Sequence, residues 1–213
     1  MKMIDDCLPD MYVKSVYDID YKKLYDDGIR YALFDVDSTL LPFDNIDVRD
    51  EHLKLFDGIR SLGIQTALYS NGSYKRVKPV ADKLNVKFVA SAHKPVYKGF
   101  KVIKEMFDDK CEPVNTIFVG DSLLVDMLFA DKCGVKKILV DYIPDDGFNI
   151  KGKVVWLIQV AMSKALEIKV FHMVKNTICQ RANSFFILKI FLSEILIYDI
   201  IVYRVGRLLN RGG

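Results

Sequence analysis

Acidic, hydroxylic and basic residues follow four separate β-rich runs of this chain. The segment YALFDVDSTL at positions 31–40 ends an apolar run with two aspartates one residue apart. Because ligands of an open α/β sheet bind beyond the carboxyl ends of its strands, we expect the polar residues at these positions to share one pocket. The residues concerned are Asp35, Asp37, Ser70, Asn71, Lys94 and Asp121.

The three carboxylates in this set predict a metal site. Asp35, Asp37 and Asp121 would repel one another, and their pKa values would rise, unless a cation lay between them. Oxygen-only ligands with room for water are the surroundings that Mg²⁺ prefers. We therefore expect Mg²⁺ as the cofactor.

A divalent cation beside a carboxylate, a hydroxyl group and a lysine suits phosphoryl transfer. The metal and the ammonium group offset the charge of the transferring oxygens, and a carboxylate can be the nucleophile. The hydroxyl and backbone N–H groups orient the phosphate. A phosphorylated substrate is the natural expectation.

Alternating strand and helix patterns must position these residues. The β-rich runs are nearly all apolar, which is typical of parallel strands covered on both faces by helices. We predict an α/β fold with a doubly wound, Rossmann-like parallel sheet of about five strands. The predicted strands span 31–37, 65–71, 87–91, 116–121 and 136–141, and the predicted helices span 50–62, 73–84, 96–107 and 123–132.

Composition excludes several other classes of protein. The net charge of +3 over 213 residues, with no basic stripe, argues against a nucleic-acid partner. The four cysteines have no disulfide or zinc spacing, and the N-terminus shows no secretory pattern, so we expect a cytoplasmic protein.

The C-terminal third has a different character. We expect a catalytic domain over 1–150 and a helical, apolar extension over 151–213. Within 185–203, thirteen residues are Phe, Ile, Leu or Val, but Lys189, Glu194 and Asp199 interrupt them. The stretch is long enough to cross a bilayer, but these charges oppose insertion. Packing on protein and contact with or crossing of a membrane, aided by the basic residues from Arg204 onward, all stay open.

Four motifs in order resemble those of the haloacid dehalogenase (HAD) superfamily phosphatases. They are Asp-x-Asp-x-Thr at 35–39, Ser70-Asn71, Lys94-Pro95, and Gly120-Asp121 with Asp126. The chain departs from the pattern at two positions, with Ser38 where members usually have Asn and Val125 where a threonine is frequent.

The resemblance implies a role for each motif residue. Asp35 would be the nucleophile that forms an aspartyl-phosphate, and Asp37 the general acid and then base. Mg²⁺ would be held by the Asp35 carboxylate, the Asp37 carbonyl and Asp121. In the remaining roles, Thr39 would support the phosphate-binding loop, Ser70 and the Asn71 backbone would hold the phosphate, Lys94 would stabilise its charge, and Asp126 would be a supplementary acid.

The spacing between the motifs and the sequence of the N-terminal segment indicate which branch of the superfamily the chain resembles. About thirty residues separate Thr39 from Ser70, and Asn71 lies close to Lys94, so neither usual cap insertion fits. The segment from 9 to 43 is similar to the YqeG family of subclass IIIA, itself similar to mitochondrial phosphatidylglycerophosphate phosphatases. The resemblance thus implies a capless phosphatase that converts phosphatidylglycerophosphate to phosphatidylglycerol.

Other functions stay open at this point. Small phosphorylated metabolites or phosphoproteins are alternative substrates. A receiver-type signalling domain shares the fold and an acidic pocket, but its acceptor aspartate follows the third strand, where this chain has Ala90-Ser91-Ala92. A non-catalytic assembly factor of the same fold is a further alternative.

Overall fold

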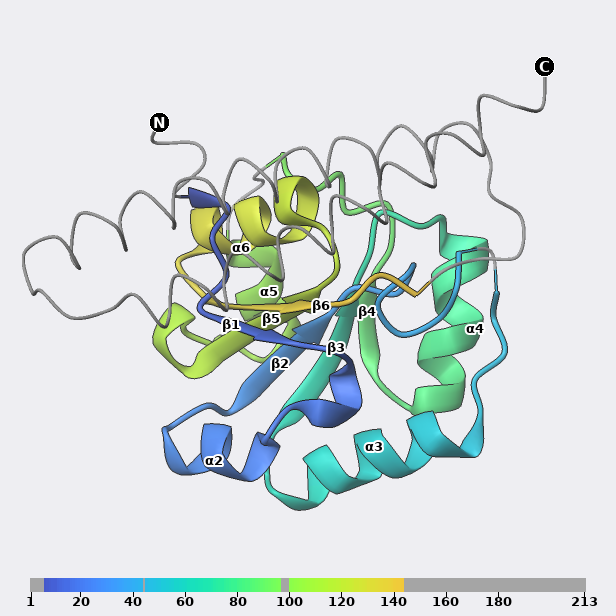
Figure 1. The fold of residues 1–213 in the computed structure, drawn as a ribbon, viewed down its shortest axis with the longest axis horizontal. Coiled ribbons are helices and arrows are strands. Elements are labelled where there is room, and N and C mark those ends of the chain that lie inside the picture. Colours follow the sequence, from blue (N-terminus) through green and yellow to red (C-terminus); the bar gives the residue numbers. More distant parts are fainter. Residues whose placement is uncertain (1–5, 44, 97–99, 144–213) are drawn as a thin grey trace, which may run out of the picture. The chain divides into compact units, whose positions relative to one another are not determined.

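A six-stranded parallel sheet forms the centre of the described fold. The computed structural model describes residues 6–43, 45–96 and 100–143. The strand order is β1-β6-β5-β2-β3-β4, and every pairing is parallel (Figure 1). The strands are β1 (Met11–Val13), β2 (Tyr31–Phe34), β3 (Gln65–Tyr69), β4 (Lys87–Val89), β5 (Thr116–Gly120) and β6 (Lys136–Val140).

The chain reverses its direction across the sheet between β2 and β5. From β2 it proceeds outward to β3 and β4, then returns to pair β5 with the other side of β2. Phe34 is in register with Val119, so Asp35 and Asp121 emerge from neighbouring strand ends. A crevice at such a switch point is the usual ligand site of an open α/β sheet.

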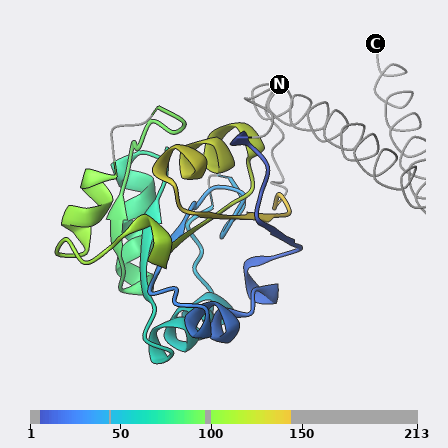
Figure 2. The same ribbon diagram turned by 90° about the vertical axis from the view of Figure 1, so that its left-hand side faces the viewer.

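Helices cover both faces of this sheet. They are α2 (Tyr21–Asp26), α3 (Asp50–Ser61), α4 (Tyr74–Leu84), α5 (Lys101–Met106) and α6 (Leu128–Cys133), with 3-10 turns at Val16–Asp18 and Pro113–Asn115 and a π-helical turn at Leu123–Met127. Side chains of α2, α3 and α4 pack on one face, and those of α5 and α6 on the other. Figures 1 and 2 both show α2 and α3 across the sheet from α6.

The sequence of strand β2 is apolar throughout because both of its faces are buried. Phe34 packs against Phe56 of α3 with ring centroids 5.1 Å apart, whereas Leu33 belongs to the cluster on the opposite face. Successive side chains of a strand point to opposite faces, so burial of both faces leaves no position for a polar residue before the strand ends.

The predicted doubly wound fold is confirmed, with several differences. Three of the predicted strands, 31–37, 65–71 and 87–91, end two or three residues earlier. A sixth strand, β1, was not predicted, because its three residues carry no local pattern and form a strand only by pairing with β6, where Met11 is in register with Ile138. The predicted helix 96–107 begins at Lys101. The predicted helix 123–132 begins with the π-helical turn, in which the carbonyl oxygen of Ser122 accepts a hydrogen bond from the N–H group five residues further along.

The capless character of the fold is also confirmed. Between Thr39 and Ser70 the described residues form a loop, α3 and β3, and between Asn71 and Lys94 they form α4 and β4. Cys7, Cys111 and Cys133 are buried free thiols, as predicted. Among the described helices, none has the length and apolarity needed to cross a membrane. The predicted extension, 151–213, lies outside the described residues.

Candidate active site

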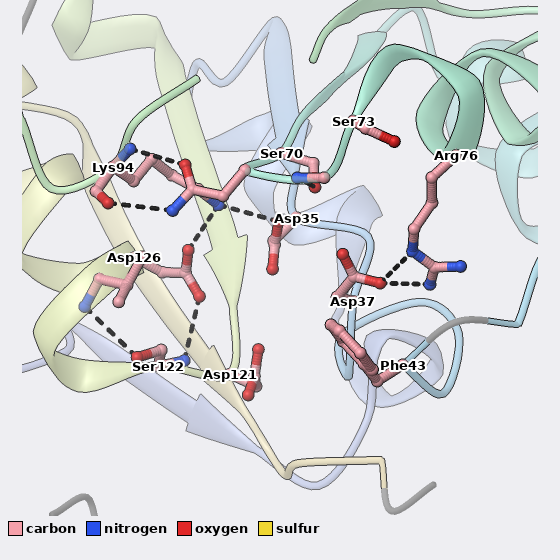
Figure 3. A pocket seen from close by; sticks show the side chains of 13 residues that line it. Asp35, Asp37, Phe43, Ser70, Ser73, Arg76, Lys94, Asp121, Ser122 and Asp126 are labelled. Atoms are coloured by element: carbon pink, nitrogen blue, oxygen red, sulfur yellow. Dashed lines mark hydrogen bonds and ion pairs between the residues drawn. The ribbon is translucent and has the colours of Figure 1, made fainter. Parts of the chain in front are cut away.

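A pocket of about 460 Å³ lies at the carboxyl edge of β2, β3 and β5 (Figure 3). Seven of the eight residues singled out from the sequence line it, and the eighth, Thr39, lies behind Asp121. Its lining comprises Asp35, Asp37, Phe43, Ser70, Asn71, Gly72, Ser73, Arg76, Lys94, Asp121, Ser122, Val125 and Asp126. Segments nearly ninety residues apart therefore converge on one pocket.

Lys94 connects two of the carboxylates. Its Nζ lies 2.9 Å from Oδ1 of Asp35 and 2.6 Å from Oδ1 of Asp126. The Lys94 and Asp126 side chains are each only 1% exposed, whereas the Asp35 side chain is 11% exposed. Asp35 is thus the member of this group that the pocket leaves accessible to a ligand.

Asn71 fixes the backbone that presents Lys94. The Asn71 carboxamide oxygen accepts from the Lys94 backbone N–H at 2.7 Å, and its Nδ2 donates to the Lys94 carbonyl oxygen at 3.0 Å. One side chain thereby pairs with both backbone groups of Lys94. The neighbouring Ser70 hydroxyl is buried and accepts from the Gly72 N–H at 3.0 Å. The sequence had suggested only the backbone of Asn71 as a functional group.

Asp121 and Asp126 are held by hydrogen bonds from different segments. The Thr39 hydroxyl donates to Oδ1 of Asp121 at 3.0 Å, and the Ser122 N–H donates to Oδ2 of Asp126 at 3.0 Å. Gly120 is required beside them, since a Cβ there would lie 2.5 Å from atoms of the Asp126 side chain. The π-helical turn and this glycine together bring Asp126 back over the end of β5.

The pocket holds more negative than positive charge. Burial, together with the charges of Asp126 and Asp35, raises the pKa of Asp121 well above its usual range. Burial likewise raises the pKa of Asp126 to about 6, although Lys94 opposes this effect. Burial alone would lower the pKa of Lys94, but the two carboxylates beside it outweigh that effect and raise it. One ammonium group does not neutralise three carboxylates.

This surplus of negative charge fits a divalent cation. Asp35, Asp121 and Asp126 each offer a carboxylate oxygen, and these atoms lie within 4.8 Å of one another. Hard oxygen ligands at an open edge, with room for water, match the coordination of Mg²⁺. Both oxygens of Asp126 already accept hydrogen bonds from Lys94 and Ser122, so Asp126 contributes mainly by charge.

Asp37 is paired with an arginine that was not among the residues predicted from the sequence. Its Oδ1 accepts a hydrogen bond from Nε of Arg76 and forms an ion pair with NH2 of the same side chain, which lies in the first turn of α4. The sequence did hold a signal for Arg76, because α4 follows β3 directly and its first turn must face the edge where Ser70 lies. Ser38, which directly follows Asp37, has a φ of 63°, which asparagine adopts more readily than most residues.

Comparison with known proteins assigns the family. The family model for haloacid dehalogenase-like hydrolases matches residues 12–134. The chain belongs to this family. It is 30% identical over 142 residues to the Bacillus subtilis protein named "Probable phosphatase YqeG", covering 66% of this chain and 81% of the relative. The resemblance to the YqeG family is thereby confirmed.

Two solved structures are also similar to this chain. One is described as a HAD superfamily (subfamily III A) hydrolase from Legionella pneumophila, with 17% identity, coverage of 58% of this chain and 71% of the other, and a TM-score of 0.43. The other is 3-deoxy-D-manno-octulosonate 8-phosphate phosphatase from Moraxella catarrhalis in complex with magnesium, phosphate and its sugar. It shows 16% identity, coverage of 48% and 64%, and a TM-score of 0.37.

Proposed function

We propose that this protein is a Mg²⁺-dependent phosphatase that acts through an aspartyl-phosphate on Asp35. The observation that carries the proposal is the position of Lys94 Nζ, 2.9 Å from Oδ1 of Asp35 in a buried acidic cluster. An ammonium group there offsets the charge of both the nucleophile and an incoming phosphoryl group. Membership of a hydrolase family and the name of the B. subtilis relative support the same reaction.

Two half-reactions follow from the residues in the pocket. In the first, an oxygen of Asp35 bonds to phosphorus, the ester P–O bond breaks, and Asp37 donates a proton to the leaving oxygen. In the second, Asp37 removes a proton from water, which attacks the phosphorus and releases inorganic phosphate, so that the Asp35 carboxylate is regenerated. Ser70 and the backbone of Asn71 orient the phosphate during both steps.

The metal would be held at the junction of β2 and β5. Its ligands would be the carboxylates of Asp35 and Asp121 and the carbonyl of Asp37, with Asp126 close by. When bound, Mg²⁺ supplies positive charge to the phosphoryl oxygens and to the Asp35 carboxylate. Thr39 orients Asp121 for this role through its 3.0 Å hydrogen bond.

For the substrate we propose phosphatidylglycerophosphate, hydrolysed to phosphatidylglycerol at the cytoplasmic face of the membrane. No cap covers the pocket in the part of the chain that the structure describes, so a bulky substrate can reach it. A substrate that itself excludes water compensates for an open site. The C-terminal extension is proposed to make peripheral membrane contact.

The test compares lipid and soluble substrates with the full-length protein. Phosphate release is measured from phosphatidylglycerophosphate in mixed micelles, from soluble sugar phosphates and from phosphopeptides, with Mg²⁺ or EDTA. We expect the lipid to give the highest kcat/KM. Loss of the nucleophile in Asp35→Asn should lower kcat by at least about 10³-fold for every substrate.

A second aspartate, outside the pocket, provides the control for Asp35→Asn. Asp108 is exposed and lies on the surface after α5, so Asp108→Asn should leave phosphate release unchanged. Preference for a soluble phosphoester would refute the lipid assignment while preserving the phosphatase. Absence of Mg²⁺-dependent phosphate release from every substrate, with wild type and Asp35→Asn alike, would refute the enzyme itself.

A further inference from the structure

Arg76 is the most extensively bonded side chain at the mouth of the pocket. Its Nε donates to Oδ1 of Asp37, with which its NH2 forms an ion pair. Its NH1 donates to the carbonyl oxygen of Asn45 at 3.0 Å, and its NH2 donates to the carbonyl oxygen of Pro42 at 3.2 Å. The guanidinium carbon lies 5.9 Å from the centre of the Phe43 ring. Arg76 therefore joins α4 to Asp37 and to the loop that follows β2.

These contacts favour a supporting role over direct substrate binding. All three guanidinium nitrogens donate to protein oxygens, two of them backbone carbonyls, so a substrate that bound Arg76 would have to replace these hydrogen bonds. The Arg76 side chain is only 11% exposed. The carbonyls of Pro42 and Asn45 fix the plane of the guanidinium group, so that its Nε edge faces Asp37 (Figure 3).

The fixed arginine determines how the Asp37 carboxylate is turned. With Oδ1 held by Arg76, Oδ2 lies on the side of Gly72 and Ser70, since a Cβ built on Gly72 would be 3.2 Å both from that oxygen and from the Ser70 hydroxyl. Ser70 is the residue to which the proposed function assigns phosphate binding. Oδ2 is therefore the oxygen of Asp37 that can exchange a proton with a group on the phosphate.

We propose that Arg76 is a positioning residue for Asp37, and this inference rests on the proposed function. Arg76 holds Oδ1 so that Oδ2 meets the leaving oxygen in the first half-reaction. Arginine suits this task because its planar fork keeps a fixed geometry, whereas the ammonium group of lysine is a point charge on a flexible stem. Misplacement of an acid by about 1 Å can cost about 10²-fold in rate.

The test varies the leaving group. An acid that protonates the leaving oxygen matters for an alkyl phosphate, whose alkoxide is a poor leaving group, and much less for p-nitrophenyl phosphate. We expect Arg76→Met to lower kcat/KM for an alkyl phosphate by roughly 10–100-fold, and for p-nitrophenyl phosphate by less than about 3-fold. Arg76→Lys keeps the positive charge and should show the same selective loss, which guards against a folding defect in the first variant.

Two further variants separate this role from its alternatives. Arg60 pairs with the exposed Asp57 on α3, away from the pocket, so Arg60→Met should leave both substrates unaffected. Because Arg76 acts through Asp37, Arg76→Met should add almost nothing in an Asp37→Asn background. Independent losses in the double variant, or equal losses for the two leaving groups, would overturn the proposal.

The same assay keeps the two proposals distinguishable. Wild-type turnover that disappears in Asp35→Asn for both leaving groups supports the proposed function independently of Arg76. A higher KM with unchanged kcat in Arg76→Met would make the arginine a substrate-binding residue and refute the positioning role, leaving the phosphatase intact.

Discussion

Replacement of Lys94 by methionine should destabilise the metal-free protein strongly. The substitution keeps most of the side-chain volume but removes the ammonium group that lies 2.6 and 2.9 Å from two buried carboxylates. At an effective dielectric constant of about 20, each of these contacts has an attraction of roughly 6 kcal/mol, part of which offsets the cost of burying the charges. Removing one partner of a buried ion pair typically costs about 3–5 kcal/mol.

This cost is large enough to measure by thermal unfolding. For a domain of this size it corresponds to a fall in Tm of about 10–15 °C, which circular dichroism in EDTA would detect. The variant should also lose phosphatase activity, because no ammonium group remains beside Asp35. Addition of Mg²⁺ should recover part of the Tm but little of the activity.

An exposed lysine provides the control. Lys22 pairs with Asp26 at 2.7 Å, a distance like those of Lys94, but their side chains are 74% and 57% exposed. Lys22→Met should therefore leave the Tm almost unchanged. If Lys94→Met also melts within about 2 °C of the wild type in EDTA, the buried cluster is not held together by this lysine, and the electrostatic argument fails.

Two further predictions concern the same cluster. Because burial raises the pKa of Asp126 in the folded protein to about 6, its protonated form stabilises the fold at low pH. In EDTA, the free energy of unfolding of the wild type relative to Asp126→Asn should therefore fall by up to roughly 3 kcal/mol as the pH rises from about 4 to 7. Mg²⁺ should reduce this fall. Urea unfolding measures the difference, and a difference that does not change with pH would contradict the prediction. Gly120→Ala should lower both Tm and activity, since its Cβ would lie 2.5 Å from the Asp126 side chain, whereas Gly58→Ala on α3, with open space at that position, should leave activity unchanged.

The local sequence determined the elements and the acidic motif. Apolar runs such as 31–34 predict buried strands because both faces of a parallel strand are covered, and the first polar residue then marks the end of the strand. That rule alone places Asp35 and Asp121 at one edge of the sheet. It also places Ser70 there, which explains why the predicted residues converge in the structure.

The tertiary structure decided the contacts that link these residues to one another. Asn71 with the Lys94 backbone, and Arg76 with Asp37, are pairs separated by 23 and 39 positions, and neither leaves a periodic pattern in the sequence. Strand β1 likewise exists only through its pairing with β6. The periodicity of hydrophobic residues indicates which face of an element is buried. A contact between two polar side chains depends instead on where two separate elements end, and the packing of the whole domain determines those positions.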